Sequence, residues 1–383
     1  MRLLASHSSS LNMRRNCVKA QLNSSSIASF TDNNPLVSIV ILNYNGKQFL
    51  YKNLTSVFQS DYPNFEVILV DNGSSDESVY FVKSHLGQTA NLKIIVNSNN
   101  LGASEGRNIG IKHARGEILV FLDNDTFVHP QWLAKIVKAF REDRSIGAVQ
   151  CKILRAENPE LIDSTGGFLN YFAFATQRGL MELDVGQYNA QTEIFYAGGA
   201  FAFKRAVLNE IGLFDPAYFV WYEETDLCWR TWLSGYRIVY LPNSIVYHYG
   251  SGTTFRFLPT ESTQRWLINQ NTIQIKNYGI LNLFKYTFPY IAVRFAKNMF
   301  SLKKSPYSNL ISKSILITAK NFKTILKKRI IIQLYRRKSK DDVITRHMIQ
   351  HGWKDFLLGS RSKAEIKNPC ERTGINEYYN KQD

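Results

Sequence analysis

LVSIVILN (residues 36–43) and FEVILVD (65–71) are short, almost continuously apolar runs, and each ends in a polar residue. Such runs are typical of strands that are covered on both faces of a sheet. Between them, residues 46–60 carry apolar side chains at helical spacing, which predicts a connecting helix. The stretch therefore predicts a β-α-β unit whose two strands are parallel.

The same alternation continues along the chain. Further strands are expected at 92–97 and 117–123, and further helices are expected up to residue 85, at 102–114 and at 130–142. Serial β-α units predict an α/β fold, with a Rossmann-like, mostly parallel sheet and helices on both faces. Ligands of such sheets bind beyond the carboxyl ends of the strands. Asn43, Asp71 and Asp123 stand at three of these ends, so we place the candidate site there.

After residue 147 the pattern is less regular. The expected elements are strands at 147–154, 196–205 and 237–241 and a helix at 223–233. The predicted domain organisation has three parts, which are a Ser/Asn-rich flexible leader (1–34), an α/β domain (35–279) and a basic, mainly helical region (280–383).

The positive charge of the chain is concentrated in one segment. The formal net charge is +16, yet residues 281–340 hold fifteen Lys/Arg and no acid, which leaves the rest of the chain nearly neutral. A segment of this kind attracts phosphate, either of nucleic acid or of an anionic membrane surface.

The basic segment also carries a helical apolar stripe. Its members recur about every four residues and are Ile311, Ile315, Ala319, Phe322, Leu326, Ile330 and Leu334. The stripe, flanked by lysines, is typical of a helix that lies on a membrane surface. It is equally typical of a helix that packs on the domain with its lysines in water.

Cysteine usage and hydropathy predict the compartment. The four cysteines, Cys17, Cys151, Cys228 and Cys370, form no C-x-x-C pair and are expected to be reduced thiols without zinc. No apolar run approaches the ~18 residues of a membrane-spanning helix, and residues 1–16 lack the apolar core of a secretory signal. A cytoplasmic location is therefore expected.

The tripeptide Asp123-Asn124-Asp125 is the sharpest local feature. Two carboxylates that are one residue apart at a strand exit can face the same divalent cation, which prefers oxygen ligands. Such a cation can neutralise charge on a departing diphosphate. The alternative is a plain turn, in which the acidic side chains cap backbone groups.

Three further polar features are candidates for chemistry. Arg107, near the start of a predicted helix, either contacts phosphate beside free N–H groups or is simply exposed. Glu223 and Glu224 open another helix, where they either complement its dipole or supply a general base. His248 follows a predicted strand, and it is either structural or completes a metal site begun by Asp125.

Taken in order, several stretches resemble the family 2 glycosyltransferases, which have the GT-A fold. The resemblance is carried by VSIVILNYNG (37–46), VILVDNGSSDES (67–78), NLGASEGRNIGIKHARGEILVFLDNDT (100–126), AGGAFAFKR (197–205), FDPAYFVWYEETDLCWR (214–230) and GYRIVYLPNSIVYHYGSG (235–252). Within the family, the chain looks most like the rhamnosyltransferase-like branch.

The resemblance implies roles for individual residues. The implied nucleotide-sugar-binding residues are Asn43, Asp71, Asn72, Gly73, Arg107, Asp123 and Asn124. The implied ligands of Mn²⁺ or Mg²⁺ are Asp125, Asp123 and His248. Glu224, with Glu223 as its competitor, matches the base that deprotonates the acceptor hydroxyl. The chain also departs from the family pattern, because Glu224 replaces the usual Asp, and Asp123 stands where many of the rhamnosyl branch have Asn.

The resemblance implies an inverting, metal-dependent transferase that moves a sugar from a UDP-, dTDP- or GDP-sugar to a glycan or polyprenyl-linked acceptor in surface polysaccharide synthesis. We expect a peripheral location on the cytoplasmic face of the membrane, with the 281–340 segment on anionic lipid. Alternatives are a transferase to polyprenyl phosphate and a nucleic-acid-binding protein that uses the basic segment. The acidic side chains that converge on one sheet edge would repel a phosphate backbone, which disfavours the nucleic-acid-binding protein. A sugar-nucleotide pyrophosphorylase is also disfavoured, because the chain lacks a Gly-rich loop near its first strand.

Overall fold

The structure is a computed structural model of the 383-residue chain, and it describes residues 34–250, 259–300, 306–335 and 338–349. The chain divides into Met1–Pro35 and a compact unit, Leu36–Asp383. Everything described below lies in the second unit. The predicted leader (1–34), Cys17 and Cys370 lie outside the described residues, apart from Asn34 itself.

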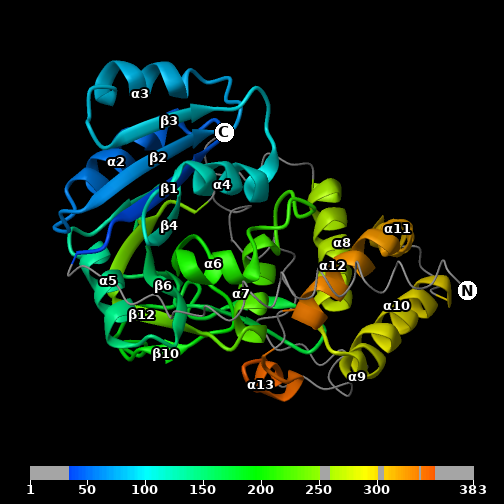
Figure 1. Ribbon diagram of the computed structural model, residues 1–383. Coiled ribbons are helices and arrows are strands. Elements are labelled where there is room, and N and C mark those ends of the chain that lie inside the picture. Colours follow the sequence, from blue (N-terminus) through cyan, green and yellow to red (C-terminus); the bar gives the residue numbers. More distant parts are fainter. Residues whose placement is uncertain (1–33, 251–258, 301–305, 336–337, 350–383) are drawn as a thin grey trace, which may run out of the picture. The chain divides into compact units, whose positions relative to one another are not determined.

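A mixed sheet forms the centre of this unit (Figure 1). Its order is β10-β12-β6-β11-β4-β1-β2-β3. The bounds are β1 (Val37–Asn43), β2 (Phe65–Asp71), β3 (Leu92–Val96), β4 (Ile118–Asp123), β6 (Ile146–Arg155), β10 (Thr192–Glu193), β11 (Ala200–Lys204) and β12 (Arg237–His248). Strands β4, β1, β2 and β3 pair in parallel, as do β6 and β12, whereas β11 runs antiparallel between β4 and β6. The predicted α/β class, with its mostly parallel sheet, is confirmed.

Shorter strands extend this sheet near the candidate site. Strand β5 (Thr126–Val128) pairs with β12, and β7 (Ile162–Ser164) pairs with β6. A separate hairpin is formed by β8 (Gly167–Leu169) and β9 (Ala175–Gln177).

Helices cover both faces of the sheet. Their bounds are α2 (Lys47–Phe58), α3 (Ser78–Leu86), α4 (Gly102–His113), α5 (Trp132–Glu142), α6 (Arg205–Ile211) and α7 (Glu223–Leu233). The buried side chains of α4, α6 and α7 share one hydrophobic cluster with the sheet residues Phe121 and Phe201. Helices α2 and α5 pack elsewhere, α2 on β5 and α5 on β6 and β12. These helices cover the faces of the sheet, while the polar residues described below lie at its strand ends.

Two predicted strand bounds were wrong. The strand expected at 196–205 is only Ala200–Lys204, because the glycines before it form a bend beside α7. The strand expected at 237–241 continues to His248, so His248 ends the strand instead of following it. A register shift between Leu241 and Ile245 admits Pro242, which has no N–H to donate to a neighbouring strand.

The described part of the 280–383 region is helical. It follows α8 (Pro259–Asn277) and comprises α9 (Ile280–Asn282), a π-helical turn (Leu283–Thr287), α10 (Phe288–Phe300), α11 (Pro306–Lys320), α12 (Phe322–Tyr335) and α13 (Asp341–Arg346). Figure 1 shows α11 and α12 beside α8, on which both pack. The domain boundary at 279/280 stays a prediction. None of the described helices has the length and apolar character needed to cross a membrane.

Candidate active site

Polar side chains from three strand ends meet at the predicted edge. Asn43 and Asp71 end the neighbouring strands β1 and β2, and Asp123 ends β4 on the other side of β1. The Asn43 amide donates to Asp71 Oδ2 at 2.8 Å, and its oxygen accepts from Asn124 Nδ2 at 2.7 Å. The edge is therefore a connected hydrogen-bond network. Its amides are used within the protein, which holds the carboxylates in place.

Asn72 and Gly73 shape the turn after β2. The Asn72 side chain accepts from Asn97 Nδ2 at 3.1 Å and donates to the Gly102 carbonyl at 3.2 Å, which ties β2 to the start of α4. Gly73 has φ +78°, and a Cβ there would lie 2.6 Å from the backbone of Asn99. Only glycine suits this position, because the conformation is left-handed and the space is filled.

The Asp123-Asn124-Asp125 tripeptide forms the turn between β4 and β5. Asn53 of α2 donates to the carbonyl oxygens of Asp123 at 3.2 Å and Thr126 at 2.9 Å, and it is itself fully buried. The tripeptide is therefore a turn that presents two carboxylates, Asp123 to Arg107 and Asp125 to His248. Asn53 carried no motif in the sequence, so its supporting role was not foreseen.

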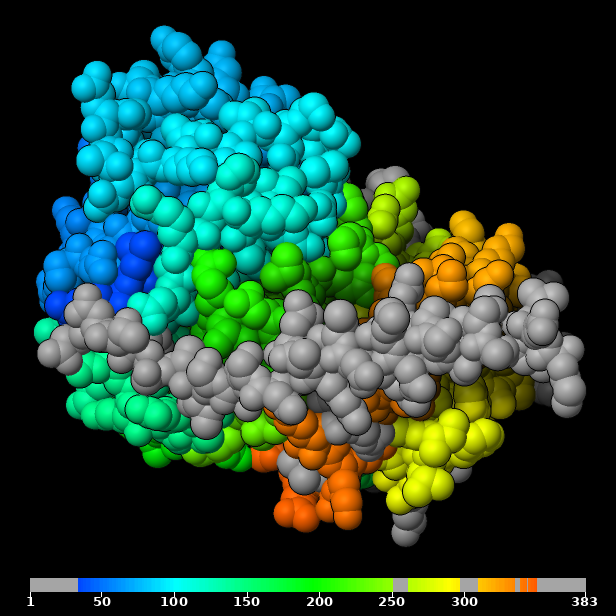
Figure 2. All heavy atoms as spheres, in the orientation of Figure 1, coloured from blue at the N-terminus to red at the C-terminus, as the bar shows by residue number. Residues whose placement is uncertain are grey.

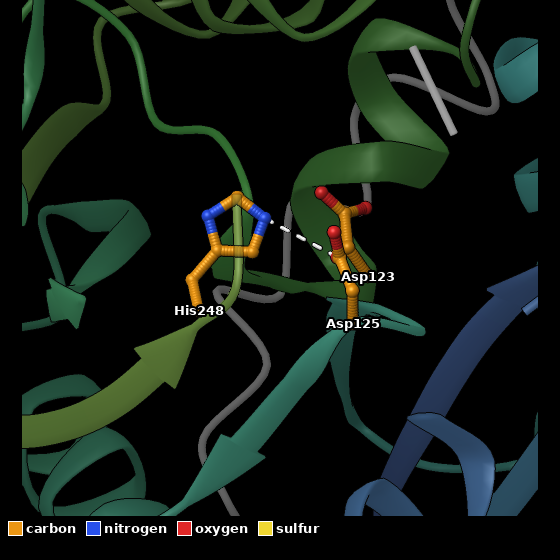
Figure 3. Close-up of side chains that lie close together, drawn as sticks. All are labelled: Asp123, Asp125 and His248. Carbon is orange, nitrogen blue, oxygen red and sulfur yellow. Dashed lines mark ion pairs between the residues drawn. The ribbon is translucent and has the colours of Figure 1, made fainter. Parts of the chain in front are cut away.

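Asp123, Asp125 and His248 come together (Figure 3). One ligand atom from each lies within 4.8 Å of the others, and His248 Nε2 is 3.2 Å from Asp125 Oδ1. The pairing of β12 with β5 causes this, because His248 stands opposite Thr126 in the register. Two carboxylates and one imidazole, of which Asp125 is buried and the other two are partly exposed, suit a divalent cation such as Mn²⁺ or Mg²⁺.

The second ring nitrogen of His248 contacts another carboxylate, that of Asp163. Its Nδ1 lies 2.9 Å from Asp163 Oδ2, and Asp163 pairs with Arg155 at 3.1 Å. Burial alone would lower the pKa of His248, but Asp125 and Asp163 outweigh it and raise the pKa well above its ordinary value. A cation at this site would need Nε2 without a proton. A single proton carried by Nδ1, next to Asp163, would meet this need. Asp163 was not predicted, because it lies in an irregular stretch without a motif.

Arg107 links the cluster of Asp123, Asp125 and His248 to the acidic start of α7. Its guanidinium pairs with Asp123 at 3.0 Å, Glu223 at 3.1 Å and Glu224 at 2.9 Å, and the residue is only 5% exposed. Burial opposes a charged guanidinium, yet the three acids raise the pKa of Arg107. The interpretation of Arg107 as a simply exposed side chain is therefore wrong. Its contact with phosphate stays a prediction, since its nitrogens face carboxylates here.

Glu223 and Glu224 differ in how open they are. Glu223 has a side chain only 7% exposed, and its Oε2 is buried without a hydrogen-bond partner. The Glu224 side chain is 19% exposed and lies against Gly198, where a Cβ would be 2.5 Å from Oε2. Burial raises the pKa of Glu224 to about 8 against the opposing charge of Arg107, and Glu223 and Asp123 add to the rise.

The backbone before these acids is strained. Trp221 and Tyr222 have φ values of +72° and +69°, and no glycine relieves them. Asn269 of α8 holds this bend by donating to the carbonyl oxygens of Val220 at 3.0 Å and Trp221 at 2.9 Å. Strained backbone of this kind is costly and is typical of functional sites.

Comparison with known proteins identifies the class of this domain. Residues 38–212 match the family described as glycosyl transferase family 2. Residues 38–212 are thus similar to a family 2 glycosyltransferase domain, and the architecture is that of the GT-A fold. The rhamnosyltransferase-like branch stays a prediction.

Individual relatives match only parts of the chain. An uncharacterized glycosyltransferase of Haemophilus influenzae is 34% identical over 103 residues, which are 27% of this chain and 41% of that protein. A poly-beta-1,6-N-acetyl-D-glucosamine synthase of Staphylococcus epidermidis is 26% identical over 216 residues, or 55% and 48% of the two chains. These curated relatives are therefore spanned for less than half of their length.

A solved structure supports the fold. The crystal structure of GalNAc-T7 with UDP, GalNAc and Mn²⁺ matches with a TM-score of 0.53 at 21% identity, over 81% of this chain and 59% of that one. This likeness concerns the architecture.

Proposed function

We propose that this protein is an inverting, metal-dependent glycosyltransferase that moves a sugar from a nucleoside-diphosphate donor to a hydroxyl of a glycan or polyprenyl-linked acceptor. The observation that carries the proposal is one connected network at the carboxyl edge of the sheet. It runs from Asn43 through Asn124 and the adjoining Asp123 to Arg107 and Glu224. Donor-binding, metal-binding and base functions need such adjacency.

Asp123, Asp125 and His248 would hold the divalent cation. When bound, the cation would neutralise negative charge on the donor's diphosphate. The protein prepares this position in two ways. Asn53 fixes the turn that presents the carboxylates, and Asp163 holds the imidazole with Nε2 toward Asp125. Mn²⁺ and Mg²⁺ both suit such ligands.

Glu224 is the proposed general base, because it is the more exposed of the two glutamates. Its carboxylate would take the proton from the acceptor hydroxyl, whose oxygen bonds to the anomeric carbon as the bond to the diphosphate breaks. A single displacement of this kind inverts that carbon. A raised pKa strengthens Glu224 as a base. Glu223, paired with Arg107 and buried, would hold the arginine in position.

The donor nucleotide would lie over the ends of β1 and β2. Asn43, Asp71, Asn72 and Gly73 form this floor, and their hydrogen bonds fix its shape. The proposed donor is a UDP-, dTDP- or GDP-sugar. Synthesis of a surface polysaccharide is the proposed context, in keeping with the polysaccharide synthase among the relatives.

Thermal stabilisation by UDP, dTDP and GDP, each with and without Mn²⁺, tests the proposal. A ligand at about a hundred times its Kd adds roughly 2.7 kcal/mol of stability. We expect one diphosphate to raise Tm only with Mn²⁺, and this rise to vanish in Asp125→Asn. Asp61→Asn, an exposed substitution of the same kind, is the matched control and should respond like the native protein. Absence of any nucleotide response would contradict the proposal.

A further inference from the structure

Helix α12 is attached to the protein through cationic side chains. Lys328 pairs with Asp215, and Arg329 donates to the carbonyl oxygen of Ile275, in the last turn of α8, at 2.8 Å. Carbonyls at a helix end lack a partner within the helix, and a cation there is favourable. These contacts fix which side of α12 faces the protein.

The sequence left two orientations open for the apolar stripe, toward a membrane or toward the domain, and the structure distinguishes them for the part in α12. The buried apolar residues are Ile325 and Ile332, which share a side with Lys328 and Arg329 at about 3.6 residues per turn. Asp215, far away in the sequence, draws Lys328 inward. The second half of the stripe, Phe322, Leu326, Ile330 and Leu334, therefore lies on the side of α12 that faces away from the described part of the domain.

The outward side of α12 is apolar and basic. Its large apolar side chains are 39–71% exposed and are Phe322, Leu326, Ile330, Ile331 and Leu334. Lys323 and Lys327, both exposed, lie between them on this side. The end of α11, just before α12, adds Leu316, which is 61% exposed, and the exposed Lys320. We call these nine residues the α12 face; in Figure 2 the orange group at the surface on the right belongs to α11.

A helix with apolar residues on both sides is normally covered on both sides. The α12 face mixes apolar groups with lysines, and residues 281–340 contain no acid that would repel an anionic partner. Lysines between large apolar groups suit the boundary of an anionic bilayer, where apolar groups enter the acyl region and ammonium groups stay at the lipid phosphates.

We propose that the α12 face docks this protein on an anionic membrane surface. The proposal goes beyond sugar transfer and does not depend on it. It assigns the contact to this one helix and to the end of α11, and it excludes Lys328 and Arg329, which hold the helix on the protein. Docking here would bring an enzyme that takes its sugar from a water-soluble donor close to acceptors embedded in the membrane.

Binding of the full chain to lipid vesicles tests the proposal. We expect cosedimentation with vesicles that contain phosphatidylglycerol, and much weaker binding to pure phosphatidylcholine. Leu326→Asn/Ile330→Asn should weaken the binding roughly tenfold or more, because two apolar groups no longer enter the lipid. Lys323→Gln/Lys327→Gln should weaken it roughly thirtyfold and reduce its salt dependence.

Matched controls keep the test specific. Leu183→Asn/Val185→Asn removes two apolar groups that are also exposed, and Lys83→Gln/Lys138→Gln removes two exposed charges elsewhere. Both controls should bind vesicles like the native chain, and all four variants should keep the native Tm.

Three results would overturn the proposal. One is native binding by the α12 variants, and another is failure of the native chain to bind anionic vesicles. The third is a native dimer that Leu326→Asn/Ile330→Asn converts to a monomer while vesicle binding persists, because the face would then belong to a second copy of the chain.

Discussion

Glu224 combines partial exposure with a raised pKa, two properties that a base needs. We predict that Glu224→Gln lowers kcat by about 10²–10⁴-fold while metal-dependent nucleotide binding persists. Glu223→Gln should cost less kcat, because Glu223 acts through Arg107. Steady-state rates with nucleotide titrations would check both. Near-native turnover of Glu224→Gln would assign the base elsewhere.

The pH dependence of the same residue has a definite sign. A base works in its deprotonated form, so kcat/KM should rise as pH rises through the pKa of Glu224. Without a cation this pKa is about 8, and a bound cation would draw it down toward the ordinary value of 4.5. The midpoint should therefore lie between these values and disappear in Glu224→Gln. A profile that falls over this range would contradict the assignment.

Arg107 is buried and compensates three acids, of which Glu223 is also buried, so its loss would leave all three uncompensated. We predict that Arg107→Met lowers the free energy of unfolding by about 3–5 kcal/mol, as measured by urea denaturation. Arg115→Met is the control, because the Arg115 side chain is 76% exposed beside Glu66 and should cost about 1 kcal/mol or less. An equal decrease in the free energy of unfolding in both variants would show that Arg107 does not stabilise the protein by compensating these acids.

At the scale of elements, β7 places Asp163 behind His248 through its pairing with β6, the neighbour of β12. We predict that Asp163→Asn weakens Mn²⁺ binding by about 10–100-fold, because the imidazole loses its partner. Titration of Mn²⁺ followed by electron paramagnetic resonance measures this directly. Asp342→Asn, at an exposed position on α13, is the control. Unchanged Mn²⁺ affinity in Asp163→Asn would place the cation away from His248.

Elements were predictable where local pattern decides them. The strands that end at Asn43, Asp71 and Asp123 are buried apolar runs, and their ends locate the edge without any tertiary information. Some partners in space were not predictable. Asp163 reaches His248 through strand pairing, and Asp215, distant in the sequence, pairs with Lys328 on the inward side of α12.

At the scale of the whole molecule, buried ion pairs join the C-terminal helices to the GT-A core. Asp215, which lies between α6 and α7, pairs with Lys276 of α8 and Lys328 of α12, and Lys276 also contacts Asp226 of α7. Burial alone would raise the pKa of Asp215, but the two lysines outweigh it and hold the pKa well below 3.8. The charged form of Asp215 is therefore the one that stabilises this junction.

This junction should weaken in acid. Because the folded pKa of Asp215 lies below the unfolded value, its contribution is complete above that unfolded value and is lost as pH falls toward the folded pKa. We predict that unfolding free energy drops below about pH 4, and that Asp215→Asn removes part of this pH dependence. The variant should also lose about 3–5 kcal/mol at neutral pH, because Lys276 stays buried with one acid fewer. Urea denaturation across pH measures both effects, and identical slopes for native and Asp215→Asn protein would show that Asp215 does not carry the junction.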